Sequence, residues 1–233
     1  MLKNQTGQWV QERSNIGSLF VDHCMHLFSS SFEEDHGLIE DLIHPVITPE
    51  DNDVLCAIPS SAEIKDAVFQ LGVLKAPGPD GYSVIFFQHY WGTVGVAVTK
   101  TVKHFFRTSF LLKQINHSFI ALVPKVEHPI RVEQFRPISL CNVVNKVISK
   151  ILAGRLRGVI AKPISHFQAA FVLGRVIQDN AIIGQEVLHS MKAKRERKGL
   201  VAFKLDMEKA YDRMEWNFLL SVLRRFGFGD RWV

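Results

Sequence analysis

One aspartate in this sequence, Asp206, stands where metal-dependent enzymes place a metal ligand. It follows the apolar run Leu200–Leu205, broken only by Lys204, which predicts a short β-strand. Apolar residues then recur at spacings of three and four, which predicts a helix: Trp216, Leu219, Leu220, Leu223 and Phe226. A carboxylate at the carboxyl end of a strand offers the hard oxygen ligands that Mg²⁺ prefers. A lone aspartate there is more often a helix cap or an ion-pair partner, so spacing alone leaves both roles open.

Two cations lie at the predicted open end of a β-hairpin. The short β-rich runs 118–123 and 135–140 are separated by a polar segment with one proline, a pattern that predicts two strands joined by a long loop. Lys125 follows the first run and Arg136 begins the second, so both side chains would project from the tip. Arginine as a fork and lysine as a point charge suit a triphosphate. On spacing alone, two exposed surface cations are the simpler interpretation.

The segment 146–160 is the clearest helix of the sequence. Its apolar residues form one face: Val147, Ile148, Ile151, Leu152, Leu156, Val159 and Ile160. Lys146, Lys150 and Arg157 line another face, and Lys162-Pro163 ends the pattern. A helix that is buried on one side and cationic on the other can lie along a phosphate backbone. An ordinary amphipathic helix without a partner fits the same spacing.

Charge is distributed unevenly along the chain. Residues 1–70 carry a net charge of −9, whereas residues 71–233 carry +14, and residues 134–178 hold seven Lys/Arg and no acid. A basic block inside apolar, folded sequence predicts a surface for a polyanion, for which nucleic acid is the usual candidate. A solvated basic face with no partner is the alternative.

Several further helices and turns follow from local patterns. Residues 16–28 carry one helical stripe, and 32–53 is acidic and reads as a loop or short helices. Ser60 and Glu63 form a capping box ahead of a helix that ends before Gly72. The string KAPGPDG at 75–81 predicts a turn, and a helix of core-packing residues begins at Gly92 or Thr93. Asp179 or Asn180 is the predicted N-cap of a helix running to Met191.

Composition indicates a globular intracellular protein, nuclear or cytoplasmic. The chain has 233 residues, 47% of them apolar, and 17 Phe argue against disorder. No apolar run is long enough to span a membrane, and the polar N-terminus has no signal-peptide pattern. The three cysteines, Cys24, Cys56 and Cys141, are widely spaced and odd in number, which predicts reduced, mostly buried thiols.

Five strings of this sequence resemble one family. LVAFKLDMEKAYDRMEW at 200–216 resembles motif A of reverse transcriptases, a strand that ends in Asp followed by four residues and an aromatic. KAPGPDG, LVPK, FRPISLCNVVNKVISKILAGRL and QAAFVLGRVIQDN resemble further segments of the same family and occur in its order. The chain therefore resembles the reverse transcriptase of plant LINE-type (non-LTR) retrotransposons, truncated after motif A.

The resemblance implies nucleotidyl transfer with two Mg²⁺ ions, which activate the primer 3′-hydroxyl and bridge the triphosphate. In it, Asp206 is the catalytic metal ligand and the backbone carbonyl of Met207 adds another. Lys125 and Arg136 look like the triphosphate-binding pair. Tyr211 matches the steric gate that favours deoxynucleotides over ribonucleotides.

The same resemblance implies an RNA template, a DNA primer and dNTP as partners, with no membrane. Gly174 and Arg175 would let the backbone and a guanidinium approach a template or primer phosphate. Three positions depart from the family pattern: Asn145, Leu173 and Met214 stand where Tyr, Pro and Val are usual.

The implied catalytic set is incomplete. In this family a second pair of carboxylates lies in an Ala-Asp-Asp turn further along, and no such turn occurs in this sequence. We therefore predict that these residues alone do not polymerise, and whether the chain is an enzyme stays open. Two alternatives from other classes are a non-catalytic nucleic-acid-binding remnant and an inert relic with an aggregation-prone palm edge.

The predicted fold class is α+β, with helix-rich fingers, a β-hairpin and the first strand of a reverse-transcriptase palm, an incomplete right hand. The predicted division has an acidic lead-in segment at 1–58, a fingers-like region at 59–199 and the start of the palm at 200–233.

Overall fold

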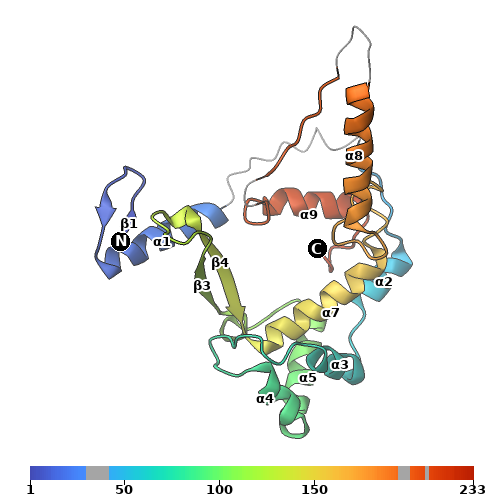
Figure 1. The fold of residues 1–233 in the computed structure, drawn as a ribbon. Coiled ribbons are helices and arrows are strands. Elements are labelled where there is room, and N and C mark those ends of the chain that lie inside the picture. Colours follow the sequence, from blue (N-terminus) through green and yellow to red (C-terminus); the bar gives the residue numbers. More distant parts are fainter. Residues whose placement is uncertain (30–41, 194–199, 208–209) are drawn as a thin grey trace. The chain divides into compact units, whose positions relative to one another are not determined.

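The computed structural model describes residues 1–29, 42–193, 200–207 and 210–233. The chain divides into two compact units, Met1–Phe32 with Asp53–Ala153 and Glu33–Asn52 with Gly154–Val233. Helices dominate, and the described strands form two small antiparallel sheets, β1–β2 and β3–β4 (Figure 1). The α+β class predicted from the sequence is therefore confirmed.

The first unit has an apolar core built by helices. These are α3 (Ser61–Phe69), α4 (Val84–His89), α5 (Trp91–Thr108) and the first part of α7 (Val143–Val159). Their buried side chains, with Leu71 just after α3, form one cluster: Ile64, Ala67, Val68, Val84, Phe87, Val98, Val102, Phe106, Val143, Val147, Ile148 and Ile151. The periodicity predicted α3, α5 and α7, and the Ser60 side chain caps α3 by accepting from the Glu63 amide at 3.0 Å. The short helix α4 was not predicted.

The N-terminal segment of the first unit contains a small hairpin and a helix. Strands β1 (Leu2–Lys3) and β2 (Trp9–Val10) pair antiparallel, and Gly7 has the positive φ of 83° that their turn requires. Helix α1 (Arg13–Phe28) confirms the helix that the apolar stripe at 16–28 predicted.

A second hairpin lies in the first unit. Strands β3 (Ser118–Pro124) and β4 (Phe135–Cys141) pair antiparallel from Ser118–Cys141 to Pro124–Phe135, and a 3₁₀ turn (Val132–Gln134) precedes β4. The short helix α6 (Lys113–Asn116) leads into β3. The predicted hairpin is confirmed, and its open end holds the loop 125–134.

The second unit contains α8 (Ile177–Ala193) and α9 (Trp216–Arg225), and α2 (Pro49–Cys56) and α7 each cross from one unit to the other. The amides of Val46 and Ile47 donate to the carbonyl of Phe226, both at 2.9 Å. The Asn52 amide group donates to the Gly227 carbonyl and accepts from the Gly229 amide, both at 2.8 Å. Segment 46–52 is therefore hydrogen-bonded to residues 226–229, which directly follow α9.

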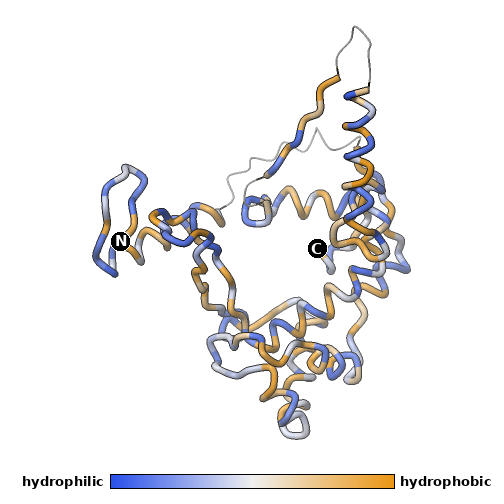
Figure 2. The backbone as a smooth tube through the Cα atoms, in the orientation of Figure 1, coloured by the Kyte–Doolittle hydropathy of each residue, from blue (hydrophilic) through white to orange (hydrophobic). Residues whose placement is uncertain are grey.

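Two predictions about local structure are wrong. Residues Leu200–Leu205 form no strand, although Figure 2 shows this run as largely apolar. A strand needs a neighbour for its backbone N–H and C=O groups, and no described residue pairs with this run. Helix α8 begins at Ile177, so Asp179 lies in its first turn and neither Asp179 nor Asn180 is its N-cap.

Other predictions have mixed outcomes. No disulfide joins Cys24, Cys56 or Cys141, as predicted, but the three residues are half-buried. Residues 32–41 of the predicted acidic loop lie outside the described residues, as do 208 and 209 of the motif A string. None of the helices in the described part of the chain is long and apolar enough to cross a membrane. The three-part division at 1–58, 59–199 and 200–233 stays a prediction.

Candidate nucleotide and nucleic-acid site

The open end of the β3–β4 hairpin carries Lys125 and Arg136, and both are exposed. Arg136 pairs with Val123 across the ladder, and the Lys125 amide extends it by donating to the Gln134 carbonyl at 2.7 Å. Paired residues of a ladder share one face, and so do residues two apart on a strand. Continued past Pro124, this register places the two cations on one face of the hairpin end, whereas the sequence predicted only that both would project from the open tip.

The loop that joins the two strands is ordered by its own hydrogen bonds. The Gln134 side chain accepts from the amides of Ile130 and Arg131 at 2.7 and 3.0 Å. The Lys125 ammonium donates to the Glu133 carbonyl at 3.2 Å, and Val132 is buried. These contacts hold the backbone around the cation pair in one conformation.

The N-terminal segment also packs on this hairpin end. The Lys3 amide donates to the Ile130 carbonyl at 2.7 Å. The rings of Phe20 on α1 and Phe135 on β4 meet edge to face, with centroids 5.2 Å apart. The acidic lead-in of the sequence thus supplies a support for the loop between the strands.

Asn142 fixes the KAPGPDG turn to the start of α7. Its side chain is 4% exposed, donates to the carbonyls of Gln114 and Ile115 at 3.1 Å, and accepts from the Asp80 amide at 3.2 Å. A Cβ on Gly78 would lie 2.4 Å from both the Asn142 amide nitrogen and its Oδ1. Glycine is therefore required for this close approach. Sequence reasoning missed Asn142, whose only signal was its place in the FRPISLCN string.

The three cations predicted to follow one face of α7 have different surroundings. The Lys146 ammonium donates to the Ala76 carbonyl at 2.6 Å, so it ties the KAPGPDG turn to the helix. Lys150 is half-buried, and Arg157 is exposed on the part of α7 that belongs to the second unit. Arg157 and Lys150 keep the phosphate-binding role as a prediction, whereas Lys146 has a structural contact that the spacing did not indicate.

Arg175 of the second unit binds backbone carbonyls. Its guanidinium donates to Ile164 at 3.3 Å, to Gln168 at 2.6 Å and also to Ser165. The preceding residue, Gly174, has a φ of +80°, which brings the arginine into this position. The geometry therefore assigns Arg175 to shaping the 164–168 segment, and its predicted phosphate contact would compete with these hydrogen bonds.

Three site residues that matched motif A, Asp206, Met207 and Tyr211, are exposed. Asp206 and Met207 lie in the irregular segment 200–207, and Tyr211 is 82% exposed in a turn before α9. Across the described ranges, no three His, Cys, Asp or Glu side chains come together as a metal site. A two-ion site needs more carboxylate oxygens than Asp206 offers. The described residues therefore do not fit the Mg²⁺ pair that the sequence motif implies.

A carboxylate of the second unit is paired elsewhere. The Lys162 ammonium donates to the Asp51 carboxylate, which also accepts from the Thr48 amide at 2.9 Å at the start of α2. The hydrogen bond from Lys162, followed by that from Thr48, holds the pKa of Asp51 below its usual value. The pKa of Glu50 is lowered too, first by a hydrogen bond with the Thr48 side chain. These groups shape the fold around α2 and are not part of the candidate site.

Comparison with known proteins places much of the candidate site in one domain family. Residues 123–233 match the family model described as reverse transcriptase (RNA-dependent DNA polymerase). The "Transposon TX1 uncharacterized 149 kDa protein" of Xenopus laevis is 31% identical over 171 residues. That alignment covers 73% of this chain and 13% of the Xenopus protein, so this chain spans a small part of its relative.

Proposed function

We propose, since this chain belongs to the reverse transcriptase family of LINE-type (non-LTR) retrotransposons, that it forms the fingers and the start of the palm of an RNA-directed DNA polymerase. The observation that carries this proposal is the β3–β4 hairpin with Lys125 and Arg136 on one face of its ordered tip. Both residues lie inside the matched region 123–233.

The proposed partners are an RNA template and a DNA primer. Residues 71–233 carry a net charge of +14, and exposed cations are available in both units, including Arg136 and Arg157. A polyanion would bind such a surface by releasing its counterions. This supports nucleic-acid binding that weakens with salt.

The proposed nucleotide contacts are those of the hairpin tip and of Tyr211. A guanidinium and an ammonium on one face suit the oxygens of a triphosphate, the first as a fork and the second as a point charge. Tyr211 would act as the steric gate against a 2′-hydroxyl. These roles come from the family resemblance, and the exposure of all three side chains is compatible with them.

Metal chemistry enters the proposal only through Asp206 and the carbonyl of Met207. Mg²⁺ in this family supplies charge neutralisation at the reacting phosphates. Because no three metal-binding side chains come together among the described residues, we derive no reaction step through the metal. We propose that these 233 residues alone bind nucleic acid without extending a primer.

The test is binding of a labelled RNA–DNA primer-template to the purified chain across a salt series. Changing Lys125 and Arg136 together to Ala should weaken binding and reduce the slope of log K against log salt by about 1.4 to 1.8. The matched control changes two other exposed cations, Arg13 and Lys113, to Ala and so lowers the net charge equally. Arg175 is left unchanged, because its loss would disturb the 164–168 segment.

The outcomes separate the competing functions. Binding that depends on Lys125 and Arg136, with no primer extension in Mg²⁺, is the expected result. Primer extension by the pure chain would contradict the proposed lack of polymerisation. Binding that is equal in the tip variant and in the control would remove the hairpin tip from the interface, and no binding at all would favour an inert relic.

A further inference from the structure

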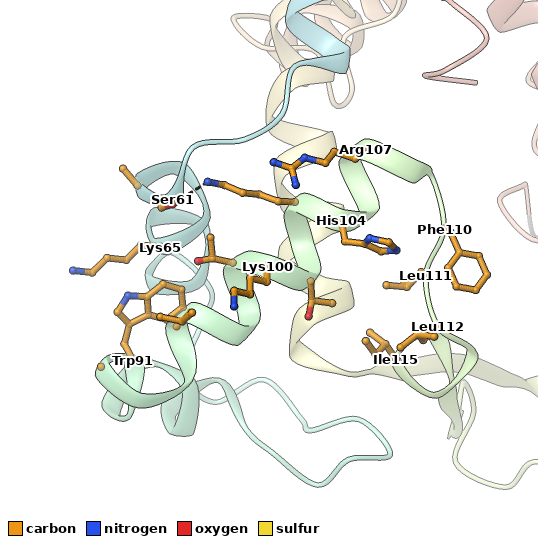
Figure 3. A pocket seen from close by; sticks show the side chains of 17 residues that line it. Ser61, Lys65, Trp91, Lys100, His104, Arg107, Phe110, Leu111, Leu112 and Ile115 are labelled. Atoms are coloured by element: carbon orange, nitrogen blue, oxygen red, sulfur yellow. Dashed lines mark hydrogen bonds between the residues drawn. The ribbon is translucent and has the colours of Figure 1, made fainter.

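A groove of about 1120 Å³ lies on the first unit, outside the region that matches the reverse transcriptase family. Figure 3 shows it along α5, between α3 and the chain that follows α5. None of the site residues predicted from the sequence lines it. It is therefore a separate feature whose chemistry must be read from its own side chains.

The charged side chains of the groove are all basic. They are Lys65, Lys100, Lys103 and Arg107, with His104 beside them, and no carboxylate is among the lining residues. Lys100, Lys103 and Arg107 are three and four residues apart, so they follow one face of α5. The Lys103 ammonium donates to the Ser61 hydroxyl at 3.1 Å, and no ion pair of a groove cation is seen in the described part of the chain. Several like charges without counter-charges favour an anionic occupant.

Aromatic rings stand at both ends of the groove. Figure 3 shows Trp91 at one end and Phe110 at the other, with Lys100 and His104 between them. The indole ring of Trp91 packs against its own helix at Gly95, where a Cβ would lie 2.7 Å from the ring. Phe110 is 56% exposed. Rings of this kind are platforms on which bases stack, whatever their sequence.

We propose that this groove binds a short stretch of single-stranded nucleic acid. Its phosphates would contact the α5 cations, and unpaired bases would stack on Phe110 and Trp91. The bases of a duplex are already stacked on one another and cannot reach the rings. An acidic peptide would satisfy the cations but has no row of bases to stack on two separated aromatic rings.

The site rests on the proposed function, since it gives a nucleic-acid enzyme a second contact with its template away from the hairpin tip. It is nevertheless carried by different residues. The two can therefore fail separately: Lys125 and Arg136 report on the tip, and Lys100, Arg107 and Phe110 report on the groove.

The experiment measures fluorescence anisotropy of labelled single-stranded 12-mers, one RNA and one DNA of the same sequence, with the full chain. Changing Lys100 and Arg107 together to Ser should reduce the slope of log K against log salt by about 1.4. Changing Arg13 and Lys113 to Ser is the control, because it removes the same charge from outside the groove. Equal binding by the two double variants would overturn the proposal. The RNA and DNA arms show which strand the groove prefers.

A second variant tests base stacking at a position that tolerates change. Phe110→Leu should weaken 12-mer binding about tenfold, whereas Phe110→Tyr should keep it. Phe110 is a better choice than Trp91, because Trp91 has packing contacts that a substitution would remove. Its indole lies against Gly95, and its ring centroid is 6.2 Å from that of Phe69. Unchanged binding by Phe110→Leu, or displacement of the 12-mer by a poly-glutamate peptide at equal charge, would show a general polyanion site and contradict the proposal.

The tip variant keeps this result distinct from the proposed function. Lys125→Ala with Arg136→Ala should weaken 12-mer binding less than the groove variant does, because the groove supplies its own contacts. If the chain binds the 12-mer through the groove but binds no primer-template, the proposed function fails and the groove stands. If the tip variant loses both ligands and the groove variant loses neither, the groove proposal fails.

Discussion

Helices α3, α4, α5 and the first part of α7 bury a shared apolar core in the first unit, whereas α8 and α9 of the second unit contain no buried residue. Ile182, Ile183, Val187 and Leu188 of α8 are all exposed. The second unit does bury apolar side chains, among them Ile47, Val172 and Phe228, but none of these lies on α8 or α9.

This difference decides which candidate residues are held in place. Lys125 and Arg136 lie on a hairpin whose loop is fixed by hydrogen bonds. Asp206 and Tyr211 lie in exposed segments without regular structure. A cation pair on a hairpin tip can be positioned by local contacts, whereas a metal-binding aspartate at a strand end depends on neighbouring strands.

The substitution with the largest expected effect lies in the KAPGPDG turn of the first unit. Gly78→Ala should lower the free energy of unfolding by about 3 kcal/mol, because its Cβ would overlap the backbone and side chain of Asn142. Urea unfolding followed by circular dichroism measures this loss. Gly72→Ala is the control, since the nearest atom to its Cβ would be 3.9 Å away. Equal stability of the two variants would show that the turn is not fixed on Asn142.

Periodicity and capping rules located most of the elements, because α3, α5, α7, α9 and the hairpin each depend on local sequence. They missed features that depend on distant residues. Asn142 gains its role from residues 80 and 114–115, and Arg175 from carbonyls up to 11 positions earlier. The run 200–205 has the composition of a strand but no partner among the described residues, so composition alone could not make it one.

A matched pair of substitutions sharpens the contrast between the units. Val147→Ala removes a side chain that is 0% exposed, and should cost about 2 kcal/mol of unfolding free energy through lost burial and a cavity. Val201→Ala makes the same change where the side chain is 74% exposed, and should change the free energy of unfolding by less than about 0.5 kcal/mol. Urea unfolding with amide hydrogen exchange measures both. A large loss at Val201 would show that the palm segment packs in solution.

The smallest expected effect concerns pH and the second unit. The Lys162 ammonium and the Thr48 amide lower the pKa of Asp51, so the folded carboxylate is favoured in its charged form. The resulting stabilisation is fully present above the unfolded pKa of about 3.9 and is lost as pH falls through the lower folded pKa. Asp51→Asn should therefore lower the melting temperature slightly at pH 6 and have no such effect near pH 2.

Thermal unfolding of the chain and of Asp51→Asn at a series of pH values measures this difference, and Asp53→Asn serves as a control on the same helix. The effect should be modest, since the pair is reached by solvent and exposed ion pairs contribute little. A gap between chain and variant that widened as the solution became more acidic would contradict the assigned direction. Such a result would mean that the protonated carboxyl is the form the fold prefers, and that Lys162 does not hold the start of α2.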